Sequence, residues 1–441
     1  MSYASAVAAL YDLGHELART PSHKFDLAHM RVLLDAIRNP QRKFKSILIA
    51  GTNGKGSTAA TLASILRAAG HRVGLYTSPH LVRVNERIRV NGAFITDDDF
   101  SSAYDYVETA VSKLIEEQKL PWHPSFFEML TAMAFYHFTA VGVQVAVLEV
   151  GMGGRLDATN VVEPVLSVIT DIDLDHQKFL GNTIAEIAFE KAGIIHERGL
   201  VVTLPQHPQA NEVIGKAVIE RGARAVSAAQ YVPPLAPGSE QNAYNRYSLM
   251  VMGESIMVDS PLVGRHQRRN LALAIAAAEQ LNEAGVAITA EAIERGIRGT
   301  LWPGRFQVIA ANERHPEIIL DVAHNPAGAW ALRSALSETC EGRSLTLLFG
   351  VLRDKAVDEV TQILFPLADR VVVTAVDNPR SATAADIAES GRRSGSEPIE
   401  SANFTDAVSK AIEITPGRGV LVITGSIYLV GEALQWLQQP E

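Results

Sequence analysis

The sequence predicts an α/β protein made of two successive domains, each built on a parallel sheet. Short apolar runs alternate with stretches of helical periodicity along most of the 441 residues, which is the pattern of strands joined by crossover helices. The segment from Gly299 to Gly304, which holds two glycines and a proline, separates two such series. We therefore expect domains at residues 1–298 and 299–441.

The first predicted strand, Ser46 to Ala50, leads into the heptapeptide Gly51-Thr52-Asn53-Gly54-Lys55-Gly56-Ser57 and then into a helix that stops at Gly70. Glycines let the backbone approach an anion, the amides at a helix start point at it, and Lys55 adds a positive charge. A plain glycine-rich turn is the alternative interpretation. The motif differs from the common Walker form, yet it predicts a site for a nucleotide triphosphate.

The later elements extend this pattern. Further strands of the first sheet are expected at Val73–Tyr76, Gln144–Val150, Val165–Thr170 and Gly199–Leu204, followed by a hairpin at Tyr247–Met252 and Ser255–Asp259 and by helices at Arg269–Ala284 and Ala290–Arg298. The second domain is expected to hold strands at Phe306–Ala310, Ile318–Asp321, Leu345–Gly350, Val371–Val376 and Val420–Thr424. The predicted fold is a P-loop-type parallel-sheet ATPase domain followed by a smaller Rossmann-like α/β domain.

Composition narrows the functional classes. The chain is 47% hydrophobic and 20% charged with a net charge of -9, which gives no electrostatic footprint for nucleic acid. Its single cysteine, Cys340, cannot form an intrachain disulfide or a Cys-based zinc site. No apolar run reaches the roughly 18 residues that span a bilayer. We therefore expect a cytoplasmic protein that acts on small molecules rather than on nucleic acid or membranes. We also expect it to be a monomer.

Polar residues follow two later strands, where ligands of open parallel sheets bind. Glu149 ends one strand, and one such carboxylate suffices for Mg²⁺, which fills its other positions with water and phosphate oxygens. Thr170 to His176 places acids at alternate positions, Asp171, Asp173 and Asp175, before the histidine, and any of them could approach a metal. A helix cap or arginine partner for Glu149 and a structural hydrogen bond for His176 are the alternatives.

Lys191 is the third candidate, because it falls inside the apolar stripe of its predicted helix, formed by Ile184, Ile187, Ala188 and Ile195. A desolvated lysine has a lowered pKa and a reactive neutral amine, although a side chain that snorkels to the surface is the alternative. In the second domain, Asp321 and His324 close a strand and are expected to face the same cleft as Lys55. Arg305 could reach a phosphate there or form an ordinary salt bridge.

Together these residues resemble the folylpolyglutamate synthase and dihydrofolate synthase family, a branch of the Mur ligase superfamily. The resemblance covers nearly the whole sequence. It rests on segments in the family's order: Gly51–Ser57, Thr77–Leu81, Asn85–Ile88, Leu148–Asn160, Asp175-His176, Leu180-Gly181, Glu190–Ile194, Pro303–Phe306 and Asp321–Pro326.

The resemblance implies a role for each matching position. ATP would be bound by Gly54, Lys55, Gly56, Ser57, Asn270, Arg305 and Asp321, and two Mg²⁺ ions by Ser78, Glu149 and His176. Lys191 would carry a carbamate, and Lys55, Lys191, Asp321 and His324 would serve catalysis. The pterin substrate would contact Phe25, Asp26, Ser125, Phe126, Phe127, Glu128, Leu156, Asp157 and Ala158. Phe25 and Ser125 depart from the family's usual residues at their positions.

The implied reaction joins L-glutamate to dihydropteroate or a reduced folate, with ATP as co-substrate and an acyl phosphate as intermediate. A synthase that only extends folates and a ligase of cell-wall precursors are the nearest alternatives. The phosphate loop begins at residue 51, which leaves too little chain for the nucleotide-sugar domain of the cell-wall enzymes. An ATP-hydrolysing switch or binding module is a different class, and it would leave Lys191, Asp321 and the pterin-side segments unexplained.

Overall fold

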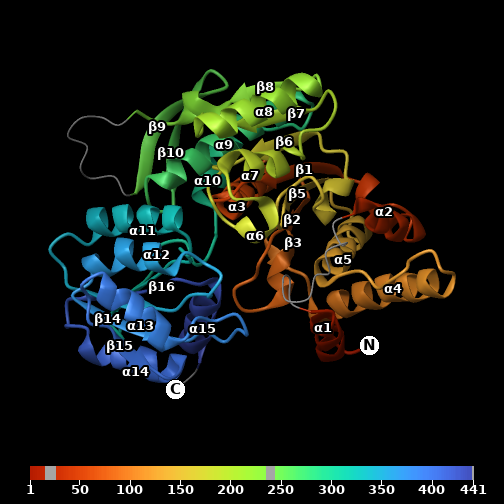
Figure 1. Ribbon diagram of the computed structural model, residues 1–441. Helices are drawn as coiled ribbons and strands as arrows, with labels where there is room; N and C mark the ends of the chain where they lie inside the picture. Colours follow the sequence, from red (N-terminus) through yellow and green to blue (C-terminus); the bar gives the residue numbers. More distant parts are fainter. Residues whose placement is uncertain (15–25, 235–243, 440–441) are drawn as a thin grey trace. The chain divides into compact units, whose positions relative to one another are not determined.

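The computed structural model describes residues 1–14, 26–234 and 244–439. The chain divides into two compact units. The first unit comprises residues 1–233, 248–258 and 269–300, and the second comprises residues 234–247, 259–268 and 301–441. Both are α/β units, which confirms the predicted fold class (Figure 1).

The first unit is built on an eight-stranded sheet of order β4-β3-β2-β5-β1-β6-β7-β8. The six strands from β2 to β8 in this order run parallel, and β3 and β4 are antiparallel to their neighbours. The strands are β1 (Lys45–Ala50), β2 (Val73–Tyr76), β3 (Ile88–Val90), β4 (Ala93–Phe94), β5 (Val145–Glu149), β6 (Leu166–Ile169), β7 (Leu200–Thr203) and β8 (Arg224–Ser227). Strand β1 therefore lies between β5 and β6, and the segments that follow these strands leave the same edge of the sheet.

Helices pack against this sheet, and its strands bury both faces. The helices are α1 (Tyr3–Asp12), α2 (Leu27–Ala36), α3 (Lys55–Ala68), α4 (Asp97–Glu116), α5 (Phe126–Ala140), α6 (Gln177–Leu180), α7 (Ile184–Ala192), α8 (Pro208–Glu220), α9 (His266–Glu283) and α10 (Ala290–Arg298). Leu48 and Leu148 belong to a core cluster that includes residues of α2, α5 and α7. The next residue along, Ile49, points to the opposite face, and α3 contacts β1, β5, β2 and α10.

A two-stranded sheet follows, made of β9 (Asn245–Val251) and β10 (Glu254–Ser260). Met252 and Gly253 join the strands with φ of 53° and 80°, the left-handed pair expected of a tight hairpin turn. The predicted hairpin is confirmed, with its strands slightly longer than expected.

The second unit holds a six-stranded sheet of order β11-β12-β16-β13-β14-β15, in which only β11 is antiparallel. Its strands are β11 (Gln307–Ile309), β12 (Glu317–Leu320), β13 (Leu345–Phe349), β14 (Arg370–Thr374), β15 (Ile399–Ser401) and β16 (Val420–Thr424), and its helices are α11 (Pro326–Thr339), α12 (Val357–Leu364), α13 (Ala384–Arg393), α14 (Phe404–Ile414) and α15 (Ile427–Gln438). Val371 and Val373 join a cluster with residues of α11, α12 and α13. Val372 points the other way, and α14 contacts the same strand.

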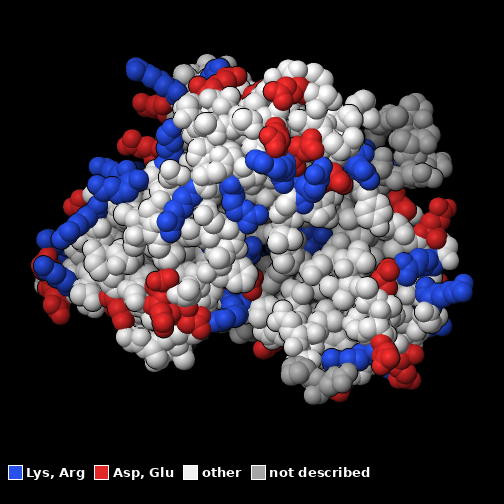
Figure 2. Space-filling model, turned by 180° about the vertical axis from the view of Figure 1, so that it is seen from behind, with Lys and Arg blue, Asp and Glu red and all other residues white. Residues whose placement is uncertain are grey.

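The surface carries both signs of charge. Basic and acidic side chains lie interspersed over the face seen in Figure 2. Within the described ranges, no helix has both the length and the apolar character needed to cross a membrane.

Candidate active site

The loop between β1 and α3 carries the predicted phosphate site. Gly54 caps α3 in the left-handed conformation, with φ of 85°, and Lys55 begins the helix. A Cβ at Gly54 would lie 2.1 Å from Asn270 Oδ1, and one at Gly51 would lie 1.8 Å from Thr170 Oγ1, so only glycine fits at either position. Lys55 Nζ donates to the Thr52 carbonyl at 3.2 Å. The amides of the first turn have no partner within the helix, which makes this end of α3 an anion site.

Lys191 lies directly against this loop. Its side chain, on α7, is only 4% exposed, and Nζ donates to the Gly51 carbonyl at 2.7 Å. Burial, and next the positive charge of Lys55, lower the pKa of Lys191 to about 7, while the carboxylates of Asp175 and Asp157 oppose this shift. A large fraction of this amine is therefore neutral at physiological pH, in agreement with the desolvated lysine predicted from its apolar stripe.

The three predicted metal residues have two sets of contacts, one joining Ser78 and Glu149 and one joining His176 and Asp175. Glu149 ends β5 beside Ile49 of β1, is 5% exposed, and accepts a hydrogen bond from the Ser78 amide at 3.2 Å. His176 has a left-handed backbone, with φ of 52°, and its Nε2 lies 4.0 Å from Asp175 Oδ2. The described part of the chain holds no group of three or more His, Cys, Asp or Glu placed to bind a metal.

These residues nevertheless fit magnesium. Mg²⁺ takes few protein oxygens beside a phosphate, and the buried Glu149 carboxylate, at the end of the strand next to β1, meets that need. His176 contributes a nitrogen donor, which suits manganese better. Ser78, Glu149 and His176 as magnesium ligands stay a prediction.

The second unit gathers its own predicted residues around Asp321. This carboxylate accepts hydrogen bonds from the amides of Phe306, at 2.8 Å, and Ala323, at 2.9 Å. Burial raises the pKa of Asp321, against the opposing effects of the Arg305 guanidinium and of these amides. His324 Nδ1 donates to the Val322 carbonyl at 2.9 Å. Asp321, Arg305 and His324 therefore lie in one cluster at the carboxyl end of β12.

Comparison with known proteins finds matches over nearly the full length of the chain. Residues 49–278 match the Mur ligase middle domain, and residues 304–427 match the Mur ligase glutamate ligase domain. The chain is 36% identical over 414 residues to the dihydrofolate synthase/folylpolyglutamate synthase of Bacillus subtilis, covering 92% of this chain and 93% of the relative. It is 34% identical to the folylpolyglutamate synthase of Lacticaseibacillus casei over 99% of both chains. The chain belongs to the dihydrofolate synthase/folylpolyglutamate synthase family of Mur ligases.

Solved structures of this family share the fold. Folylpolyglutamate synthase of Mycobacterium tuberculosis, solved with ADP and AMPPCP, superposes with a TM-score of 0.87 at 34% identity and 99% coverage of both chains. The apo form of the L. casei enzyme gives a TM-score of 0.84 at 33% identity and full coverage. As a family member the chain is an ATP-dependent ligase.

The segments predicted to contact the pterin are held mainly by local hydrogen bonds. Asp26 caps α2 through the Ala28 amide at 2.8 Å, and Ser125 and Glu128 form a capping box at the start of α5. The Phe127 ring lies over Gly151, where a Cβ would be 2.7 Å from it. Phe25 lies outside the described residues. Contacts of these residues with a pterin stay a prediction.

The carboxylate of Asp157 organises the loop after β5 by hydrogen bonds. Oδ2 accepts from the amides of Gly151 and Met152, both at 3.0 Å, and Oδ1 accepts from the amide and the hydroxyl of Thr159 at 3.0 and 2.6 Å. Leu156 and Ala158 flank it, and Ala158 begins a 3₁₀ turn. The hydrogen bonds of Asp157 therefore serve this loop.

Sequence reasoning missed two residues near the phosphate loop. Arg269, which precedes Asn270 on α9, binds the Asp171 carboxylate, and Gln206 binds the backbone on either side of Asp171. The only signal was the alternate spacing of the three acids, which suggested metal ligands. The structure instead gives Asp171 an arginine partner.

Proposed function

We propose that this chain ligates L-glutamate to dihydropteroate and to reduced folates at the expense of ATP, releasing ADP and phosphate through an acyl phosphate. The observation that carries the proposal is the buried Lys191 amine bound to the Gly51 carbonyl of the phosphate loop, in a chain with full-length similarity to enzymes named for both activities. A solved relative was captured with AMPPCP and folate together.

The phosphate loop supplies most of the chemistry that this chain needs. A carboxylate becomes reactive toward an amine once it accepts the γ-phosphoryl group of ATP, and that transfer brings two anions together. The first-turn amides from Gly54 to Ser57 and the ammonium of Lys55 stabilise the charge that spreads over the phosphoryl oxygens. Magnesium bound by Ser78, Glu149 and His176 would neutralise part of the same charge. The glutamate amine then attacks the acyl phosphate, and phosphate leaves.

Asn270 lies against Gly54 of the phosphate loop and would bind the nucleotide in this proposal. ATP contacts of Arg305 and Asp321, and a role for His324 in ordering the incoming glutamate, stay predictions. The His324 ring is oriented by its bond to the Val322 carbonyl, which leaves Nε2 as the acceptor nitrogen in the neutral ring. If His324→Ala changes neither the turnover rate nor the KM for glutamate, this role is wrong.

Lys191 is proposed to carry a carbamate. Its neutral amine attacks CO₂, forming one C–N bond and releasing a proton, and the product is an anion at a position where a cationic ammonium would face Lys55. The carbamate would face the metal side of the phosphate loop. Intact mass spectrometry in bicarbonate should show a mass increase of one CO₂ on the wild type and none on Lys191→Ala. Full activity of Lys191→Ala without added small acids would refute the role.

Relatives with a single activity define the nearest alternative. The L. casei relative is named folylpolyglutamate synthase, and a Schizosaccharomyces pombe relative, 32% identical, is named probable dihydrofolate synthetase. The chain could therefore perform one of the two reactions. A cytoplasmic location and a monomeric state stay predictions.

The deciding experiment measures glutamate-dependent ADP release with magnesium, in parallel with 7,8-dihydropteroate and with tetrahydrofolate as acceptor. Activity with both acceptors supports the bifunctional proposal, and activity with one assigns a single role. ATP hydrolysis that needs neither glutamate nor an acceptor would favour the ATP-hydrolysing switch.

A further inference from the structure

A cluster outside the recognised motifs holds the first half of the phosphate loop in place. The Asp171 carbonyl, just after β6, accepts hydrogen bonds from the amides of Thr52, at 2.8 Å, and Asn53, at 3.2 Å. Thr52 Oγ1 also donates to the Asp173 carbonyl and accepts from the Asp173 amide, each at 3.0 Å. These bonds occupy the amides of Thr52 and Asn53, so the amides available to phosphate begin at Gly54.

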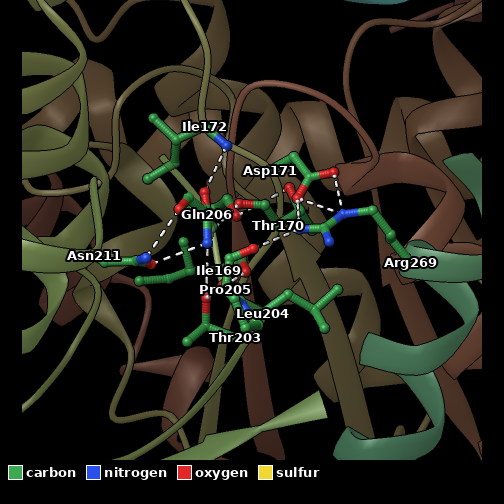
Figure 3. Close-up of polar contacts among 11 residues, drawn as sticks. Ile169, Thr170, Asp171, Ile172, Thr203, Leu204, Pro205, Gln206, Asn211 and Arg269 are labelled. Carbon is green, nitrogen blue, oxygen red and sulfur yellow. Dashed lines mark hydrogen bonds and ion pairs between the residues drawn. The ribbon is translucent and has the colours of Figure 1, made fainter. Parts of the chain in front are cut away.

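The Asp171 carboxylate accepts hydrogen bonds from the guanidinium group of Arg269 (Figure 3). Arg269 Nε lies 3.0 and 2.9 Å from the two carboxylate oxygens, and Nη2 lies 2.6 Å from Oδ1. Nη2 also donates to the Pro205 carbonyl at 3.0 Å. Two parallel donors on a carboxylate fix its orientation more strictly than a single contact does.

The backbone around Asp171 is braced by Gln206, as Figure 3 shows. Gln206 Oε1 accepts from the Ile172 amide at 2.8 Å, and Nε2 donates to the Thr170 carbonyl at 3.1 Å. Gln206 is itself tied to Asn211 by two backbone-to-side-chain bonds of 3.0 and 2.9 Å. With its neighbours and its carboxylate both fixed, the Asp171 carbonyl has little freedom to turn away from the loop.

Arg269 is also adjacent in sequence to Asn270, whose Oδ1 lies against Gly54. Two consecutive residues of α9 therefore act on the phosphate loop. Asn270 contacts the loop directly, and Arg269 binds Asp171, whose carbonyl accepts hydrogen bonds from the loop. The Asp171 carboxylate would place a negative charge near bound phosphates, and the Arg269 guanidinium offsets that charge. Both side chains are about one third exposed, at 33% for Arg269 and 38% for Asp171.

We propose that Arg269 and Asp171 are a positioning pair for nucleotide binding, which holds the Thr52–Asn53 half of the phosphate loop and sets α9 against it. The proposal rests on the proposed function only in assigning the loop to a nucleotide. The pair touches no reacting atom, so its contribution lies in nucleotide affinity.

The test uses the full chain and measures the dissociation constant for ADP by calorimetry, with the KM for glutamate alongside. Arg269→Gln should weaken ADP binding most, by about threefold to fivefold, because it leaves the Asp171 carboxylate uncompensated. Asp171→Asn should have a smaller effect. The double variant should bind ADP better than Arg269→Gln alone, and Arg269→Lys should be intermediate because lysine cannot donate twice in parallel. The KM for glutamate should stay unchanged throughout.

A matched control lies at the other end of the same helix. Arg224 on β8 pairs with Glu283 at 3.3 Å and also donates to Gln280. Arg224→Gln removes an ion pair of α9 far from the loop and should leave ADP affinity unchanged, even where its melting temperature falls as much as that of Arg269→Gln.

Three results would overturn the pair: unchanged ADP affinity in both single variants, losses that multiply in the double variant, or an equal loss in Arg224→Gln. Wild-type protein that binds ADP but ligates no glutamate would contradict the proposed function and leave the Arg269–Asp171 proposal standing. Wild-type protein that binds no ADP would contradict both proposals.

Discussion

Two glycine-rich loops follow neighbouring parallel strands of the first unit. They differ in whether a carboxylate of the chain accepts hydrogen bonds from their backbone amides. The loop after β5 directs the amides of Gly151, Met152 and Thr159 at the carboxylate of Asp157, so the chain supplies its own anion. The loop after β1 has no acid at the start of α3 and presents Lys55 there instead. A glycine-rich loop at a strand end therefore predicts a ligand anion only where no carboxylate of the chain already takes that place.

The largest expected effect of a substitution in these two loops is on ligation activity, at Lys55. Lys55→Ala removes the cation of the loop that lacks an internal anion, and we expect kcat/KM for ligation to fall on the order of 10²- to 10³-fold. ADP release under saturating glutamate measures this. Lys113→Ala on α4, whose side chain is 73% exposed, is the control and should retain full activity. A loss of less than threefold at Lys55 would contradict the assignment of the phosphate site.

A substitution in the loop after β5 should lower the stability of the protein and leave its affinity for nucleotide unchanged. Asp157→Ala leaves three amides and the Thr159 hydroxyl without their acceptor, and we expect the free energy of unfolding to drop by about 3 kcal/mol. Urea denaturation measures this drop, and calorimetry should show ADP affinity within twofold of the wild type. Asp26→Ala, which removes only the cap of α2, should cost about 1 kcal/mol. If Asp157→Ala abolished ADP binding in a protein of unchanged stability, the contrast between the loops would be lost.

The smallest expected effect is a pH dependence at Lys191, which packs against the first loop. Its pKa is lowered to about 7, so between that pH and the ordinary lysine pKa the unfolded state binds more protons than the folded state. Stability must therefore rise with pH over this window. In CO₂-free buffer the wild type should gain about 2 kcal/mol more than Lys191→Met between pH 7 and pH 9.

Chemical denaturation at these two pH values checks the Lys191 prediction. Lys113→Met serves as the control, because the Lys113 side chain is 73% exposed, and this variant should show the wild-type gain. Equal gains in the wild type and in Lys191→Met would mean that the buried amine stays charged.

The sequence predicts those features of the structure that depend on residues close together in the chain. A strand that runs into Gly51–Ser57 predicted the turn and the helix that follows it, and the apolar stripe around Lys191 predicted its burial, because both depend on neighbours within a few residues. The short strands β3, β4, β8 and β15 escaped prediction, since β4 has only two residues and β8 and β15 are mostly exposed. Ser125 and Glu128 carry the spacing of a capping box, a local pattern that was interpreted only as substrate contact.

What the sequence could not predict depends on pairing across long separations. Asp171 and Arg269 are 98 positions apart, and neither residue signals its partner. Three alternating acids before a histidine suggested a metal, and only the fold shows that Asp171 serves the phosphate loop through its carbonyl and α9 through its carboxylate. The Asp157 hydrogen bonds are equally hidden, since an acid after a glycine-rich stretch fits a ligand contact as well as a loop anchor.

In the proposed reaction, ATP bound at the loop after β1 gives its γ-phosphoryl group to a carboxylate before glutamate attacks. The most direct test supplies an acceptor whose carboxylate is labelled with ¹⁸O and follows the label by mass spectrometry of the released phosphate. If the acyl phosphate forms, each phosphate released during ligation should carry one ¹⁸O atom. Phosphate without label, formed at the rate of ligation, would contradict an acyl phosphate intermediate and with it the function proposed for this site.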